Sequence, residues 1–418
     1  MDLKLRLREM SNKMQKERFS ILILVALVFF PASRVQSEEL QTAHQPQRLV
    51  LAHYMPWFAT RPVSQVWGWH WTMNAFDPEM MNEGKRQIAA HYYPLVGSYD
   101  SNDADVLEYH LLLMKLSGID GVIVDWYGLT DLHDYKSLHR NTKHLVEQVT
   151  RLGMKFAICY EDQTIPALEK SGRLTAENRV THAKRELAWM AENWFQLKSY
   201  VRLEGRPVLL SFGQTGLTNK EWTQCLAGLK LPVAYFSQHH RRTSAMGAFD
   251  WPVPQEGLKA IQRFQKTSRD WQYSIPVAFP RFVDIYAEAK VHKSFGRIDD
   301  NRGVTFQTSM EQALKTKAPI VQIATWNDWG EGTVIEPSRR FGYRDLKVIQ
   351  KLRRNYIDPH FSASVDDLDL PLQLLELRRK SKSPEQKQRL DMIRTLISTG
   401  KLKEAQIELK RFALPKTR

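Results

Sequence analysis

Short apolar runs rich in β-branched and aromatic residues recur between positions 48 and 355 of the chain. They cover residues 49–55, 120–126, 155–161, 207–212, 232–238, 247–251, 275–280 and 319–325. Runs of this length, bounded by polar and turn-forming residues, are typical of buried strands. The pattern therefore predicts eight strands.

Helical patterns fill most of the gaps between these strands. The predicted helices cover residues 103–116, 137–152, 178–195, 255–264 and 308–316. Asp103 begins an apolar i, i+3, i+4 series, and Thr308 with Glu311 fits a capping box. The gap at 239–246 is too short for a helix. Eight strands that alternate with helices predict an α/β protein with a (β/α)8 TIM barrel over residues 48–355, and an open doubly wound sheet is the alternative.

The pattern changes beyond residue 360, where residues 361–418 predict a helical appendage. Ser383 stands before Pro384 at the start of one predicted helix, and Gly400 interrupts the pattern further on. Residues 386–412 resemble a single helix–turn–helix unit of the tetratricopeptide kind. One such unit cannot bury its own apolar face. We therefore expect it to pack on the barrel or on a protein partner.

Residues 1–37 have the features of an export signal. A basic lead is followed by a run of twelve apolar or small residues at 19–30, and Val35 and Ser37 are small residues suited to cleavage before Glu38. Twelve residues are too few to span a bilayer comfortably, because a spanning helix needs about 20. We predict an exported protein, periplasmic or extracellular. An uncleaved signal anchor, which would hold the protein at the membrane, is the alternative.

The net charge of +14 is concentrated at the two ends of the 418-residue chain. Residues 371–418 carry thirteen Lys and Arg against five acids, and residues 1–18 carry six against three. The middle of the chain has no basic stripe with interleaved aromatic residues, so we predict no nucleic acid partner. A hydrophobic content of 43% is sufficient for a sizeable core.

Cysteine and histidine positions predict no metal or other cofactor. The two cysteines, Cys159 and Cys225, fall in different predicted elements and are compatible with one disulfide. His53, His70 and His91 lie near aromatic motifs, but no H-x-E-x-x-H type of spacing links them.

Acidic and aromatic residues collect where the predicted strands end. In a TIM barrel these carboxyl ends meet at one face, where active sites lie. The candidate site residues at these ends are Tyr54, Trp57, Asp125, Trp126, Tyr127, Glu161, Asp162, His239, Trp251, Trp326, Asn327, Asp328, Glu331 and Glu336. Any one of them could instead cap a helix or satisfy a loop. Taken as a set, they predict a common binding site.

A mouth lined by acids and aromatic rings is suited to a sugar. Hydrolysis of a glycosidic bond usually needs two carboxyl groups, one to protonate the leaving oxygen and one to act as base or nucleophile. Asp328 and Glu331 lie three residues apart in the segment TWNDWGEGTVIEPS, residues 325–338. Each charge should raise the affinity of the other carboxyl for a proton. The alternative is a polar loop fastened by Trp326 and Trp329.

Several of these segments resemble glycoside hydrolase families 99 and 71. The motifs are AHYMPWF, YYPLVGSYDSND, SGIDGVIVDWYG and TWNDWGEGTVIEP, in that order over residues 48–340. The resemblance implies cleavage of α-linked mannans, glycans or glucans. It implies Glu331 as the general acid and Asp328 as the partner carboxylate. Family 99 typically has Glu at the latter position, and an Asp there is more similar to the family 71 loop. Glu161 falls where family 99 has a third acid.

These observations predict an exported glycoside hydrolase that cleaves internal α-linkages of a polysaccharide or glycan of the α-mannan or α-glucan type. Two other classes of function remain as alternatives. One is a non-catalytic glycan-binding barrel. The other is a glycosyl-transferring enzyme of polysaccharide assembly.

Overall fold

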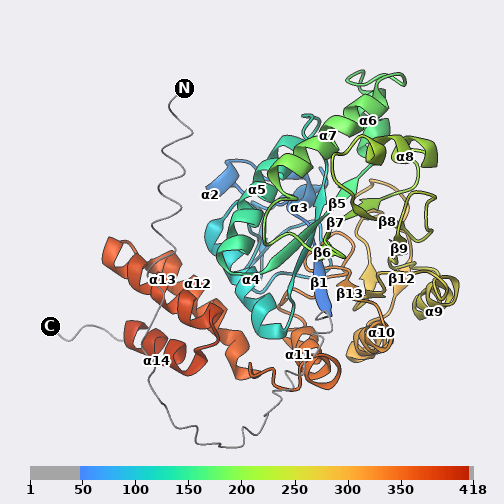
Figure 1. Ribbon diagram of the computed structural model, residues 1–418. Helices are drawn as coiled ribbons and strands as arrows, with labels where there is room; N and C mark the ends of the chain where they lie inside the picture. The colour runs from blue at the N-terminus through green and yellow to red at the C-terminus, as the bar shows by residue number, and fades with distance from the viewer. Residues whose placement is uncertain (1–47, 414–418) are drawn as a thin grey trace, which may run out of the picture. The chain divides into compact units, whose positions relative to one another are not determined.

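A computed structural model describes residues 48–413 of the chain, so the predicted export signal lies outside the described residues. Parallel strands occupy the centre of the described part (Figure 1). They are β1 (Leu49–Tyr54), β4 (Gly121–Trp126), β5 (Lys155–Glu161), β7 (Arg206–Phe212), β8 (Ala234–Gln238), β9 (Gly247–Phe249), β10 (Val277–Ala278) and β13 (Ile320–Ile323). All eight lie within the segments predicted from the apolar runs, or within one residue of them.

The strands form a barrel rather than an open sheet. Their order is β10-β13-β1-β4-β5-β7-β8-β9, and every pairing along this path is parallel. A parallel bridge between Phe249 and Ile275 joins β9 to the residues before β10. The backbone N–H of Asp250 also donates to the carbonyl of Ile275 at 3.0 Å. The predicted (β/α)8 barrel is confirmed, and the doubly wound alternative is excluded.

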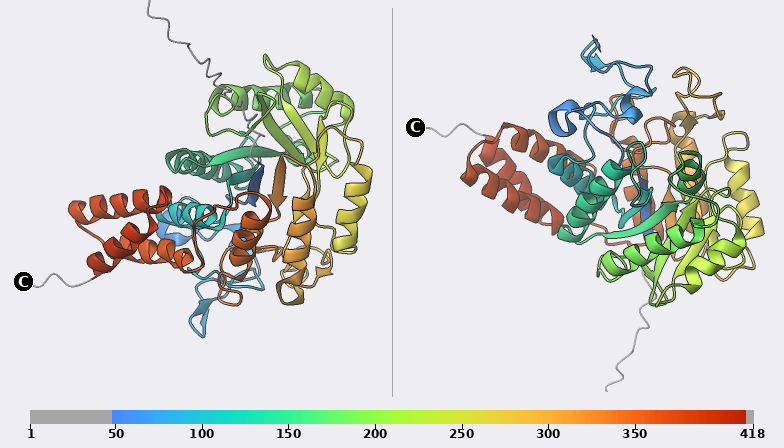
Figure 2. Two further views of the ribbon diagram at one scale, coloured as in Figure 1. Left: turned by 60° about the horizontal axis from the view of Figure 1, so that its bottom comes forward. Right: turned by 90° about the horizontal axis from the view of Figure 1, so that it is seen from above.

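Helices surround the strands in the views of Figure 2. The larger ones are α4 (Ala104–Ser117), α5 (Tyr135–Arg151), α7 (Arg179–Asn193), α8 (Asn219–Ala227), α9 (Leu258–Thr267), α10 (Val304–Lys315) and α11 (Arg344–Tyr356). Shorter elements are α2 (Arg61–Ser64), α3 (Trp69–Thr72), α6 (Thr164–Lys170), β2 (Met81–Asn82), β3 (Lys85–Arg86), β6 (Arg202–Leu203), β11 (Phe282–Val283), β12 (Arg297–Ile298) and the 3₁₀ turns Asn301–Gly303 and Asp366–Asp369. Residues 239–246, all of them described, contain no helix, as predicted.

Helix caps agree with the sequence at two positions and differ at a third. Asp103 caps α4 by accepting from the backbone N–H groups of Asp105 and Val106, and Ser383 caps α13 (Pro384–Ser398). The predicted cap at Thr308 is wrong. Helix α10 begins at Val304, because Gly303 takes a left-handed conformation with φ of 91° and reverses the chain one turn earlier.

Alternate residues of each strand face opposite sides of the barrel wall. Ile123 of β4 packs inside the barrel with Leu51 and Cys159. Its neighbours Val122 and Val124 pack outside the barrel, in the layer shared with the surrounding helices. This alternation decides which strand residues can reach the barrel interior.

The C-terminal residues form three helices, α12 (Leu370–Lys380), α13 and α14 (Leu402–Ala413). Their apolar residues join the same core as those of α4, and Figure 1 shows α12 and α13 beside α4, with α14 packed on α12 and α13. Arg378 of α12 donates to Glu108 of α4 at 2.6 Å and to Asp391 of α13 at 2.8 Å. Gly400 separates α13 from α14. Within residues 48–413, no helix is long and apolar enough to cross a membrane.

Candidate active site

Four carboxyl groups meet at the carboxyl ends of the strands. Asp125 is the second-last residue of β4, Glu161 ends β5, and Asp328 and Glu331 lie on the loop after β13. Asp125, Glu161 and Asp328 are only 5%, 8% and 4% exposed, and Glu331 is half-buried. Burial and then the charge of Asp328 raise the pKa of Asp125 to about 8. Burial and then Asp125 raise the pKa of Glu161 well above its usual range. The structure therefore brings these four predicted acids together.

The two acids of the loop have different environments. Burial raises the pKa of Asp328 to about 6, although backbone N–H groups of Glu331 and Gly330 lower it. Burial, and then the charges of Asp328, Asp284 and Asp125, raise the pKa of Glu331 well above its usual range. Around neutral pH this favours an ionised Asp328 beside a protonated Glu331. When neighbouring carboxyls have different pKa values, one site can hold both an acid and a base.

A buried hydrogen-bond network holds the loop in place. The side-chain oxygen of Asn327 accepts from the backbone N–H of Met55 at 2.8 Å, and its amide donates to the Met55 carbonyl at 3.0 Å. Glu336 accepts from the hydroxyl of Tyr99 at 2.7 Å and from the indole N–H of Trp329 at 3.2 Å. The loop is therefore fastened to β1 below the two acids.

A second segment packs over the loop from the side of β11. The backbone N–H groups of Val283 and Ile285 donate to the carbonyls of Glu331 and Gly330, both at 2.9 Å. Gly332 has a φ of +67°, and a Cβ atom there would lie 2.8 Å from the Val283 carbonyl oxygen. Glycine is therefore required at 332, both for the backbone conformation and for the close approach.

Aromatic rings flank the acids on two sides. Trp57 is half-buried and stacks on His70 with ring centroids 4.1 Å apart, and it meets Tyr127 edge-on at 6.4 Å. A cavity of about 530 Å³ beside them is lined by Trp69, His70, Tyr127, His133, Asp134 and Tyr135. Inside the barrel, Trp251 contacts the rings of His53 at 4.8 Å and Phe212 at 5.0 Å. Of the predicted aromatic residues, Trp57, Tyr127 and Trp251 are thus the ones on the side of the barrel interior and of this cavity.

Three predicted site residues face away from the barrel interior. Trp126 is fully buried among the rings of Trp189 and Trp194. The hydroxyl of Tyr54 lies 3.0 Å from His110 Nδ1 in the outer core, and Asp162 accepts from the indole N–H of Trp222 at 2.8 Å. Their prediction as sugar-binding residues is wrong. Each neighbours an inward-facing residue, and adjacent strand residues point in opposite directions.

Four further predicted residues have structural partners, and three of them are fully buried. Asn327 and Glu336 are buried in the network that fastens the loop. Trp326 is buried beside the ring of His110, at 5.5 Å. His239 Nδ1 lies 3.4 Å from Asp250 Oδ1, and both residues line a cavity against α9. The burial of Asn327, Glu336 and Trp326 contradicts their prediction as substrate-binding residues. His239 is half-exposed, so its role in binding stays a prediction.

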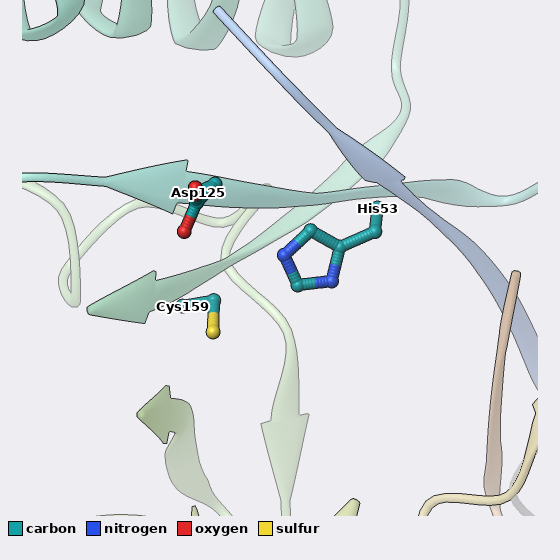
Figure 3. Close-up of side chains that lie close together, drawn as sticks. All are labelled: His53, Asp125 and Cys159. Carbon is teal, nitrogen blue, oxygen red and sulfur yellow. The ribbon is translucent and has the colours of Figure 1, made fainter. Parts of the chain in front are cut away.

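The structure adds residues to the site that the sequence did not indicate. His53 and Cys159 face the barrel interior beside Asp125, and the ligand atoms of the three side chains all lie within 4.8 Å of one another (Figure 3). Burial, and then the nearby charges of Glu331 and Asp328, raise the pKa of Tyr286 well above its usual range. Alternate residues of a strand face the same side, and His53 and Cys159 share the inward face with Asp125. This alternation is the sequence signal that could have identified them. Both cysteines are described and both are free, so the disulfide that their number allowed is not present.

Comparison with known proteins finds relatives among glycan-processing enzymes. The chain is 23% identical over 298 residues to a glycoprotein endo-alpha-1,2-mannosidase-like protein of Danio rerio, covering 64% of each chain. It is 22% identical over 349 residues to glycoprotein endo-alpha-1,2-mannosidase of Rattus norvegicus, covering 73% of this chain and 70% of the relative. The chain thus spans less than two thirds of the length of the Danio rerio relative.

A solved structure and a family model add to this comparison. The GH99 endo-alpha-mannosidase from Bacteroides thetaiotaomicron superposes with a TM-score of 0.56 at 16% identity, covering 77% of this chain and 98% of that one. Residues 298–349 match the family model described as Glycosyltransferase WbsX. The predicted resemblance to family 99 is confirmed. In sequence the chain is a relative of the glycoprotein endo-α-mannosidases, and it has the (β/α)8 barrel fold of glycoside hydrolase family 99.

Proposed function

We propose that this chain is a glycoside hydrolase that cleaves internal α-linkages of a polysaccharide or glycan, of the α-mannan or α-glucan type. The observation that carries the proposal is the pair formed by Asp328 and Glu331. Their carboxyls lie on one loop at the barrel mouth, and their pKa values are raised to different extents. The names of the relatives support the same reaction class.

In this proposal the two carboxyls have different roles in the reaction, one as acid and one as base or nucleophile. Glu331 gives its proton to the glycosidic oxygen, and the bond between that oxygen and the anomeric carbon breaks. Asp328 acts as the base or the nucleophile. One water is consumed overall. Its hydroxyl group ends on the anomeric carbon, and its remaining proton restores Glu331.

The remaining residues of the site bind and orient the sugar. Asp125 and Glu161 have raised pKa values, so each can both donate and accept hydrogen bonds with sugar hydroxyls. Trp57 and Tyr127 offer ring faces next to the cavity of about 530 Å³, and aromatic faces are suited to the C–H faces of a pyranose.

We also propose that the protein is exported, because residues 19–30 form an apolar run and small residues precede Glu38, as in a cleaved export signal. Expression of the full chain and of residues 38–418 in the same cells tests this. Export requires that only the full chain leaves the cytoplasm. Cytoplasmic retention of both forms would contradict it.

A glycosyl transfer reaction is the second candidate, because the match described as Glycosyltransferase WbsX covers the loop with Asp328 and Glu331. Incubation of the purified protein with α-mannans and α-glucans, with and without sugar nucleotides, separates the two. Hydrolysis produces new reducing ends without a sugar nucleotide. Growth of an acceptor glycan only when a sugar nucleotide is supplied would favour transfer. Binding without either reaction would indicate the non-catalytic barrel.

A further inference from the structure

Three side chains that can bind a metal ion come together inside the barrel. They are His53 of β1, Asp125 of β4 and Cys159 of β5, and their ligand atoms all lie within 4.8 Å of one another (Figure 3). The strand register explains why they meet. Asp125 and Cys159 are direct partners in the pairing of β4 with β5, so their side chains project from the same face of the sheet. His53 is the partner of Ile123, two residues before Asp125 on the same face.

These groups lack the partners that buried polar groups normally have. His53 is fully buried, and neither ring nitrogen makes a hydrogen bond of normal geometry within the described residues, although the side chain of Gln322 lies close enough to oppose the lowering of the His53 pKa. Asp125 Oδ1 also makes no hydrogen bond within that part of the chain. Cys159 is a buried free thiol. A buried polar atom left without a partner typically costs about 1–3 kcal/mol, so such a cluster calls for an explanation.

We propose that His53, Asp125 and Cys159 form a site for a single divalent transition-metal ion, with Zn²⁺ as the best fit. One nitrogen, one oxygen and one sulfur ligand suit Zn²⁺, whereas Mg²⁺ and Ca²⁺ prefer oxygen ligands alone. Three protein ligands leave a fourth position for water or a sugar hydroxyl, which is the arrangement of catalytic rather than structural zinc sites.

The geometry needs only a small adjustment to hold the ion. Tetrahedral zinc with bonds of about 2.0–2.3 Å separates its ligand atoms by roughly 3.3–3.8 Å. The ligand atoms of the three side chains now lie up to 4.8 Å apart, so they would have to move by about 1 Å, which side-chain rotation allows. The edge-on contact of Trp251 with the ring of His53 limits how far the imidazole can turn away.

The electrostatic environment is compatible with metal binding. Burial lowers the pKa of His53 to about 3, so the ring is neutral and its lone pair is available. Burial and nearby acids raise the pKa values of Asp125 and Cys159, so binding would release their protons, as is usual for such ligands. The ion would also offset the repulsion between Asp125 and Asp328. This inference concerns binding and does not depend on the proposed hydrolysis.

Metal content and cobalt spectroscopy of the full chain test the site. Protein stripped with a chelator is dialysed against Zn²⁺ or Co²⁺, and the bound ion is measured by mass spectrometry. We expect one ion per chain and, with Co²⁺, a thiolate-to-metal charge-transfer absorption band. Cys159→Ser should remove the band, and His53→Gln should weaken Zn²⁺ binding at least about tenfold. Thermal unfolding shows that each variant is folded.

Cys225→Ser is the matched control, because Cys225 is also a buried free thiol but lies on α8, outside the barrel interior. It should keep both the stoichiometry and the band. Folded wild-type protein that retains no Zn²⁺ or Co²⁺ above the level of a buffer control would overturn the proposal. Equal loss of the band in Cys159→Ser and Cys225→Ser would also overturn it. Loss of hydrolysis alone would not affect it, because the readout is the bound ion.

Discussion

The backbone N–H of Glu331 donates a hydrogen bond to Asp328 Oδ1 at 3.0 Å, so the Asp328 carboxylate is held against the backbone of the residue that carries the other acid. This bond stabilises the ionised form of Asp328, and the charge of Asp328 in turn stabilises the protonated form of Glu331. One short loop therefore supplies an acid and its partner.

Loss of the partner carboxylate should stop the reaction whatever the leaving group. We expect Asp328→Asn to reduce cleavage of polysaccharide by about 10²–10⁴. The activity should not return with a glycosyl fluoride, because a base or nucleophile is needed in both cases. Steady-state kinetics on both substrates measures this, with oligosaccharide binding as the control for an intact site. Near-normal turnover by Asp328→Asn would rule out the pair and point to Glu161.

Stability should fall as pH rises, because the pKa of Asp125 is higher in the folded protein than in the unfolded chain. The unfolded carboxyl has a pKa near 3.9, and the folded one has a pKa of about 8. Between these values the folded state holds a proton that the unfolded state has lost, so rising pH favours unfolding. Asp125→Asn should therefore stabilise the metal-free protein at pH 8 by about 1–3 kcal/mol, and much less at pH 4.

Denaturant unfolding at both pH values, in the presence of a chelator, measures this difference. Asp270→Asn is the control, because Asp270 is exposed. It should change stability little at either pH. An Asp125→Asn protein that is equally stabilised at pH 4 and pH 8 would contradict the raised pKa.

Two adjacent aromatic residues should behave in opposite ways. Trp126→Ala should destabilise the fold by about 3–5 kcal/mol, because the indole is fully buried between β4 and the outer helices. Tyr127→Ala should leave the thermal midpoint nearly unchanged and weaken oligosaccharide binding about tenfold, because Tyr127 lines a cavity and its pKa is raised by burial and then by the charges of the nearby Asp125 and Glu161. Thermal unfolding and calorimetric titration measure the two effects. A reversed pattern would mean that β4 faces the other way.

Gly332→Ala should lower activity more than the same substitution at a glycine outside the site. The added methyl group would lie 2.8 Å from the carbonyl oxygen of Val283 and would push the covering segment away from Glu331. Gly342→Ala is the matched control, because Gly342 also has a positive φ, of 53°, but no atom lies within 4 Å of the added methyl group. We expect the first variant to lose most of its activity and the second to keep it. Equal activities would show that the contact is unimportant.

The fold could be predicted from the sequence because each strand is a continuous apolar run. The two loop acids could also be predicted, since Asp328 and Glu331 lie in a segment whose glycines and tryptophans do not suit a regular element. The predictions fail where they place every residue of a strand end in the site. Trp126 and Asp162 each follow an inward-facing acid and therefore face outward.

Other parts of the site depend on contacts between distant segments. Glu336 is bound by Tyr99 and His110, which lie on other elements, and nothing in its local sequence indicates this. His53, Asp125 and Cys159 are far apart in the chain, and only the register of three adjacent strands brings them together.

The most direct test of the role of Glu331 is how the cleavage rate of Glu331→Gln depends on the leaving group of the substrate. We expect this variant to lose about 10²–10⁴ of its activity on natural polysaccharide, because the leaving oxygen no longer receives a proton. With an α-glycosyl fluoride, whose leaving group needs no proton, much of the bond-breaking rate should return. Oligosaccharide binding should be unchanged. Equal loss on both substrates, or near-normal cleavage of polysaccharide, would contradict the assignment of Glu331 as the general acid.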